Sequence, residues 1–154
     1  MENILAILLA GGAGERLYPL TAHVAKPAVP FGGTYRIIDF TLSNCINSDI
    51  RRVLILTQYK ALELNQHIRH GWNILSPELG EYIEVIPPMK RVHTDWYLGT
   101  ADAVFQNNQS IQAENPAKTL ILSGDHIYKM NYHDMLDWHR RHGADVTVAT
   151  IQVP

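Results

Sequence analysis

The chain has 154 residues, of which 46% are apolar and 18% are charged, a balance typical of one globular domain and not of a disordered chain. Its formal net charge of −2 argues against a protein that coats nucleic acid or anionic membranes. The apolar runs are far shorter than the ~20 residues that cross a bilayer, and the first residues lack the basic start of a secretory signal. The single cysteine, Cys45, excludes an internal disulfide framework and a cysteine-based zinc site. We therefore expect a cytoplasmic domain that binds neither nucleic acid nor membrane.

Short apolar runs predict the strands of a sheet. Residues 4–10, 53–56 and 119–122 are runs of this kind, and glycine follows the first and the last of them within two residues. Residues 83–86 are a shorter candidate, stopped by Pro87 and Pro88. Unbroken apolar runs that stop in this way are typical of parallel strands buried on both faces. Residues 146–153 alternate at first, which predicts a further strand with one wetter face.

Helical spacing of apolar residues predicts the elements between these strands. Stripes of this kind cover 35–47, 61–68, 101–111 and 132–139. In the third segment we expect these residues to share the buried face: Ala101, Val104, Phe105 and Ile111. The last helix is expected to have Asn131 as its N-cap and Gly143 as its C-terminal stop. The alternation predicts an α/β domain with a Rossmann-like, mostly parallel sheet flanked by helices.

A glycine-rich loop follows the first predicted strand. Gly11, Gly12 and Gly14 would let the backbone approach a ligand closely and present N–H groups to phosphate oxygens. Arg16 adds a planar cation suited to phosphate. The loop matches neither the Walker pattern nor the dinucleotide pattern. A tight strand-to-helix turn with a surface arginine is the alternative.

Two charged residues are further candidates. Lys26 precedes Pro27, which favours extended backbone, and could serve as a second cation for a polyphosphate or be an ordinary solvated lysine. Asp125 follows the predicted strand at 119–122, at the sheet edge where α/β proteins bind ligands. Its carboxylate suits Mg²⁺, and a turn aspartate is the alternative.

Small residues at 99–102 open a predicted helix and would let a flat base lie against the backbone. The alternative is an ordinary helix start, with Thr100 or Asp102 serving the first turn. His139 and His142 are spaced for metal binding, but no third ligand is evident, and we interpret both as structural. No nucleophile–base pair is evident either. The candidate groups together suit nucleotidyl transfer, where positioning and charge neutralisation do most of the work.

Four motifs carry a resemblance: the first resembles the signature of the sugar nucleotidylyltransferases in general, and the other three resemble more narrowly the glucose-1-phosphate adenylyltransferase family. They are LAGGAGERLYPLT at 9–21, KPAVPFGGTYRIIDFTLSNCINSDIRRVLILTQYK at 26–60, WYLGTADAVFQN at 96–107 and GDHIYKMNY at 124–132. The resemblance implies a GT-A-like domain that uses Mg²⁺ to convert ATP and α-D-glucose 1-phosphate to ADP-glucose and pyrophosphate in glycogen or starch synthesis. It also implies a homo-oligomeric complete enzyme, with a small-molecule allosteric effector as a possible further partner.

The resemblance also implies roles for individual residues. The triphosphate would be cradled by Gly11, Gly12 and Gly14, with Arg16 and Lys26 neutralising phosphate charge and Asp125 binding Mg²⁺. The residues implied near the adenosine are Leu9, Ala10, Gly99, Thr100, Ala101 and Asp102. Tyr97 matches a position that contacts glucose 1-phosphate, and Gln58 and Trp96 match positions that relay regulatory signals.

The chain also departs from the family pattern. His23 is the one potential cation just before the Lys26 motif, where the family has a basic residue that serves activator binding. Family chains are longer, so we expect residues 1–154 to be the N-terminal nucleotide-binding part of the catalytic domain. The rest of that domain, with a second metal carboxylate, and a C-terminal β-helix would lie outside it. Two alternatives stay open: a non-catalytic nucleotide-binding fragment or regulatory subunit, and a transferase that uses another nucleotide or sugar.

Overall fold

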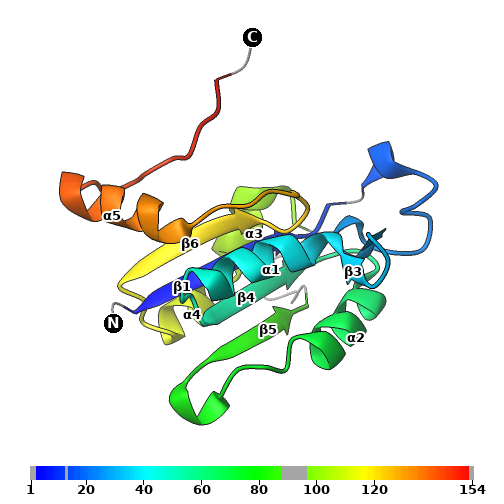
Figure 1. Cartoon of the computed structure of the whole chain (residues 1–154), viewed down its shortest axis with the longest axis horizontal. Coiled ribbons are helices and arrows are strands. Elements are labelled where there is room, and N and C mark those ends of the chain that lie inside the picture. The colour runs from blue at the N-terminus through cyan, green and yellow to red at the C-terminus, as the bar shows by residue number, and fades with distance from the viewer. Residues whose placement is uncertain (1–2, 13, 88–96, 153–154) are drawn as a thin grey trace.

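A parallel sheet forms the centre of the computed structural model, which describes residues 3–12, 14–87 and 97–152 (Figure 1). Within these ranges the sheet has four strands in the order β5-β4-β1-β6. They are β1 (Ile4–Ala10), β4 (Arg52–Thr57), β5 (Tyr82–Ile86) and β6 (Lys118–Ser123). Leu8 of β1 pairs with Ile55 of β4 on one side and with Leu122 of β6 on the other. The expected α/β architecture with a parallel sheet is confirmed.

Helices cover both faces of this sheet, which explains why its central strands are apolar without a break. The longer helices are α1 (Ile37–Asn47), α2 (Ala61–Gly71) and α5 (Tyr132–His142), and the shorter ones are α3 (Thr100–Gln106) and α4 (Asn108–Ala113). Ala6 and Leu8 of β1 belong to the core that includes residues of α1, α2 and α5. Leu5 and Ile7, which alternate with them, belong to the core on the α3 and α4 side. The described helices include none that is long and apolar enough to cross a membrane.

Short elements connect these layers. They are the 3₁₀ turns η1 (Glu15–Leu17), η2 (Lys26–Ala28) and η3 (Pro77–Leu79), and the antiparallel pair of β2 (Pro30–Phe31) with β3 (Tyr35–Arg36). Both predicted caps of α5 are confirmed: the Asn131 side chain accepts a hydrogen bond from the His133 N–H at 3.1 Å, and Gly143 follows the helix with φ 54°.

The predicted strand at 146–153 was wrong for the residues that the structure describes. Residues 146–152 form no strand and run away from the sheet, as the red end of the trace in Figure 1 shows. Val146, Val148 and Ile151 are 78%, 73% and 84% exposed. Alternation makes a segment compatible with a strand, but a strand forms only where the segment pairs with a sheet edge, and residues 146–152 pair with neither edge strand of the sheet, β5 or β6.

The predicted buried face of 101–111 was wrong in part: Ile111 is buried and Val104 packs against the core as expected, but Ala101 and Phe105 are exposed. The helix breaks at Asn107 into α3 and α4, and the buried residues are Ala103, Gln106, Asn107 and Ile111. Phe105, which was expected inside, is 68% exposed. Asn107 donates its side-chain amide to the Ala103 carbonyl at 2.8 Å, so a side-chain bond accompanies the end of α3. A single helical period therefore does not describe the whole segment.

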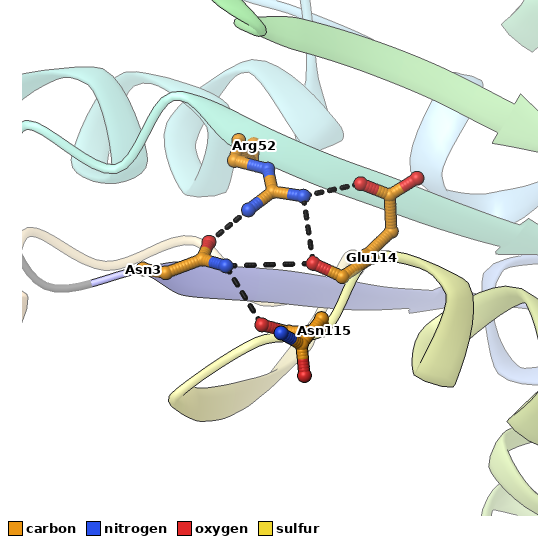
Figure 2. A network of polar contacts seen from close by, with 4 residues as sticks. All are labelled: Asn3, Arg52, Glu114 and Asn115. Atoms are coloured by element: carbon orange, nitrogen blue, oxygen red, sulfur yellow. Dashed lines mark hydrogen bonds and ion pairs between the residues drawn. The ribbon is translucent and has the colours of Figure 1, made fainter.

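A polar network joins the amino ends of three strands (Figure 2). Arg52, at the start of β4, donates to the Asn3 side chain, to the Glu114 carboxylate, and to the Glu114 carbonyl at 3.0 Å. Asn3 donates its side-chain amide to the Asn115 carbonyl at 2.8 Å, while its own carbonyl accepts from the Ala117 N–H at 2.8 Å. The network lies at the end of the sheet where the strands begin, opposite their carboxyl ends. It links the residue before β1, the start of β4 and the residues that precede β6.

Candidate functional site

The carboxyl ends of β1, β4 and β6 open into a cleft of about 380 Å³, which we call the strand-end cleft. It is lined by Leu9, Ala10, Gly11, Gly12, Lys26, Pro27, Leu56, Gln58, Tyr97, Gly99, Thr100, Ala103, Ser123 and Asp125. The chain passes from β1 through β4 to β5 in one direction and then returns to β6 on the other side of β1. The cleft therefore lies where the strand order reverses, which is the place where open α/β sheets bind ligands.

The two predicted charges at this cleft form an ion pair. Lys26 Nζ lies 2.9 Å from Asp125 Oδ2, although the residues are 99 positions apart, and their side chains are 30% and 35% exposed. The Ser123 hydroxyl donates to the other carboxylate oxygen of Asp125. Partial burial opposes ionisation of Asp125, but the hydrogen bonds from Ser123 and Lys26 and the Lys26 charge outweigh it and hold its pKa below the ordinary range. Asp125 is therefore an anion at neutral pH.

Helix α1 and its neighbours hold the segment that carries Lys26. The Arg36 guanidinium donates to the Ala28 carbonyl, two residues after Lys26, and the Ile37 N–H donates to the Val29 carbonyl at 3.2 Å. The buried Asp39 carboxylate then accepts the Arg36 N–H at 2.8 Å. The other oxygen of that carboxylate lies 2.7 Å from a ring nitrogen of His67 and 2.7 Å from the indole nitrogen of Trp72, which donates to it. These bonds join η2 to α1 and to the end of α2.

The glycine loop fits closely against this segment. A Cβ on Gly14 would lie 2.9 Å from Thr21 Cγ2 and 3.0 Å from Lys26 Cβ, and Gly14 has φ +71°, where other residues are strained. A Cβ on Gly11 would lie 3.2 Å from Gln58 Cβ. Gly11 and Gly12 line the cleft, whereas Gly14 instead keeps the loop close to Lys26.

The part of the cleft beside the start of α3 is mostly apolar, and we call it the apolar wall. Leu9, Leu56 and Ala103 line it beside the backbone of Gly99 and Thr100. A flat aromatic ligand would find area to pack against there, with backbone groups at its edge.

Two predicted residues of this helix start lie outside the cleft lining. Ala101 is exposed. Asp102 accepts the Leu98 N–H at 2.9 Å and the Gln106 amide at 2.8 Å, which is the helix-start role given above as the alternative.

Tyr97 and Gln58 meet across the cleft. The Gln58 amide lies 3.5 Å from the Tyr97 carbonyl, at the limit for a hydrogen bond, and Asn107 donates to the Tyr97 hydroxyl at 3.0 Å. Trp96, the other residue implied in regulation, lies outside the described residues. Arg16 is exposed on η1 and does not line the cleft.

Four lining residues were given no role from the sequence: Pro27, Leu56, Ala103 and Ser123. Ser123 had a usable signal, since it stands at a strand end two residues before Asp125. Leu56 and Ala103 look like ordinary core residues in the sequence, and only the topology brings them to the cleft.

A metal ion at this cleft would depend on Asp125. The described ranges contain no group of three or more His, Cys, Asp or Glu side chains that could hold a metal without help. Mg²⁺ is commonly held by one or two carboxylates together with substrate phosphates, so a lone ionised aspartate fits such a site. His139 and His142 contact the Thr147 hydroxyl at 2.9 Å and the Trp138 carbonyl at 2.8 Å, in keeping with the structural reading.

Residues 5–154 match the family described as Nucleotidyl transferase, and the chain belongs to that family. Among its relatives are proteins named glucose-1-phosphate adenylyltransferase. The Koribacter versatilis protein is 68% identical over 154 residues, covering 99% of this chain and 37% of the relative. The Rhodopirellula baltica protein is 57% identical over 154 residues, covering 99% and 34%. This chain thus spans little more than a third of these relatives.

A solved structure supports the fold. A Bacillus anthracis protein described as a glucose-1-phosphate thymidylyltransferase superposes with a TM-score of 0.67 over 90% of this chain and 50% of that one. The two sequences are 21% identical, so this likeness bears on the architecture alone.

Proposed function

We propose that residues 1–154 form the nucleotide-binding part of an enzyme that makes ADP-glucose and pyrophosphate from ATP and α-D-glucose 1-phosphate. One observation carries the proposal: Lys26 and Asp125 face each other at 2.9 Å in a cleft at the topological switch point. A cation for phosphate and a carboxylate for a metal are the two charged groups that phosphoryl chemistry needs, and the relatives' names supply the substrate class.

In this proposal the triphosphate lies over the glycine loop, where Gly11 and Gly12 leave room for close approach. Lys26 turns from Asp125 to the phosphate oxygens and neutralises their charge. Asp125, released from Lys26, holds Mg²⁺, which when bound would offset negative charge on the phosphates. An oxygen of the sugar phosphate attacks the α-phosphorus of ATP, the bond from that phosphorus to the bridging oxygen breaks, and pyrophosphate leaves with the electron pair. The residues contribute positioning and charge rather than a covalent intermediate.

The adenosine is proposed to lie on the apolar wall beside Leu9, Ala10, Gly99 and Thr100. Tyr97 lies at the same cleft, with its hydroxyl bonded to Asn107, and is proposed to contact glucose 1-phosphate. Gln58, beside the Tyr97 carbonyl, is proposed to relay regulatory signals to that tyrosine.

Arg16 stays a proposed phosphate cation, and its exposure on η1 leaves its side chain free to reach a bound triphosphate from the rim. The complete enzyme is proposed to be a homo-oligomer in glycogen biosynthesis, open to a small-molecule effector. It would work in the cytoplasm, where ATP and sugar phosphates are made.

A chimera tests the activity directly. Residues 1–154 would replace the matching segment of the Koribacter versatilis relative, and ADP-glucose formation would be followed by pyrophosphate release. We expect turnover with ATP and little with UTP. Absence of turnover in a folded, ATP-binding chimera would favour the non-catalytic alternative. Equal rates with the two nucleotides would contradict the adenylyl assignment.

A further inference from the structure

Helix α1 carries a row of polar residues on its buried face. Thr41, Asn44 and Ser48 are 0%, 5% and 1% exposed and lie three and four positions apart, so they follow one side of the helix. Buried polar groups destabilise a core unless they are hydrogen-bonded, so the partners of these residues indicate what the row holds.

All three residues bond to the segment that begins at the end of β6. The Thr41 hydroxyl donates to the Ser123 carbonyl at 3.1 Å. The Asn44 amide donates to the Tyr128 carbonyl at 3.0 Å, and its oxygen accepts the Met130 N–H at 3.3 Å.

At the far end of the segment, the Ser48 hydroxyl accepts the Tyr132 N–H at 2.8 Å. The row therefore contacts the segment near its start, its middle and its end.

The segment needs such partners because it lacks regular structure of its own. Residues 124–131 form neither strand nor helix, so their backbone groups must be satisfied from elsewhere. Asp125 lies within this stretch, two residues from the carbonyl that Thr41 holds. The opposite partner, Lys26, is held through Arg36 and Asp39 at the start of the same helix. One helix thus sets both sides of the 2.9 Å ion pair.

We propose that Thr41, Asn44 and Ser48 are positioning residues that hold Asp125 opposite Lys26 for nucleotidyl transfer, an inference that rests on the proposed function. None of the three lines the strand-end cleft, so they act through the loop rather than on the substrate. A displacement of about 1 Å in a catalytic group can cost on the order of 10²-fold in rate.

The test compares two asparagines of α1. Asn44→Ala removes the buried amide, and Asn47→Ala is the matched control, because Asn47 is exposed on the same helix. In the 154-residue chain, hydrogen–deuterium exchange of amides 126–132 should speed up by about 10-fold or more in Asn44→Ala and stay unchanged in Asn47→Ala. In the chimera, kcat should fall about 10- to 100-fold in Asn44→Ala with KM for ATP within about 3-fold.

A second pair guards against misfolding of Asn44→Ala. Thr41→Val keeps the side-chain shape and removes the hydroxyl donor, whereas Thr41→Ser keeps the donor. We expect Thr41→Val to lower kcat and Thr41→Ser to keep kcat near the wild-type value. A role of Thr41 in packing alone would not produce this difference.

Unchanged exchange in both Asn44→Ala and Thr41→Val would overturn the inference, and so would faster exchange with an unchanged kcat. A wild-type chimera without turnover would instead refute the proposed function, and the exchange data would still decide whether α1 holds the loop.

Discussion

Asp125→Asn keeps the shape of the side chain and removes its charge, so it separates a metal-binding carboxylate from a turn residue. The ion pair with Lys26 is about one-third exposed on each side, and pairs this accessible contribute roughly 0–1 kcal/mol to stability. For a domain of this size that corresponds to a fall in Tm of no more than about 4 °C. The loss of one preorganised electrostatic contact in a transition state instead costs about 10²–10³ in rate, or ~2.7–4 kcal/mol.

The assay is steady-state turnover of the chimera beside its thermal unfolding. We expect kcat to fall 10²- to 10³-fold, KM for ATP to change far less, and Tm to stay nearly constant, since the carboxylate acts mainly on charge that develops during reaction. Asp137→Asn is the matched control, because Asp137 forms an exposed pair with Arg140 on α5. Full kcat in Asp125→Asn, or a loss of activity that follows a loss of fold, would rule out a metal-binding role for Asp125.

Three further predictions concern the same loop and ion pair. Lys26→Ala should raise KM for ATP, lower kcat, or both, with Tm nearly unchanged. Lys26→Arg should restore activity only partly, because a planar guanidinium replaces a compact ammonium. Wild-type kinetics in Lys26→Ala would show that Lys26 does not act in the site. Gly14→Ala should destabilise the chain by roughly 1–3 kcal/mol in urea unfolding, and by more than Gly80→Ala does, since both glycines have left-handed φ but a Cβ on Gly80 would meet nothing within 4 Å; equal costs would contradict the close fit of the loop. The wild-type chain should have a higher free energy of unfolding than Asp125→Asn, by an amount that is constant above about pH 5 and shrinks as the pH falls below 3.8, the ordinary pKa of the carboxyl. The reason is that a lowered folded-state pKa favours the folded state only while the unfolded carboxyl is ionised. A difference that grew in acid would mean that the folded-state pKa is raised instead.

The sheet was predictable because burial on both faces leaves a direct mark in the sequence. The run at 4–10 is unbroken since helices cover both sides of β1. The run at 119–122 lies in the edge strand β6, where Leu120 and Leu122 are buried but Ile121 is 53% exposed. The strand expected at 146–153 was not found in its described part, residues 146–152, because alternation does not determine whether a segment docks on a sheet edge. The break at Asn107 is accompanied by bonds of its side chain to Ala103 and Tyr97, which no helical period encodes.

The site was predictable in its charges but not in its supports. Lys26 and Asp125 stand out because each lies beside a recognisable local signal: Lys26 comes just before a proline-rich segment, and Asp125 comes just after a strand end. In the sequence, Thr41 and Asn44 look like interruptions of an apolar stripe. Their role could not be predicted, because their hydrogen-bond partners lie 82 and 84 residues further along the chain. Contacts of that range appear only after the fold has brought α1 against the end of β6.

An amide NMR titration of the 154-residue chain would show whether the strand-end cleft binds an adenine nucleotide. Mg-ATP should produce saturable shifts at Gly11, Gly12, Gly99 and Thr100, which line the cleft, and Mg-UTP should produce much weaker ones. Shifts confined to residues away from the cleft would exclude nucleotide binding there, and equal responses to the two nucleotides would exclude a preference for adenine.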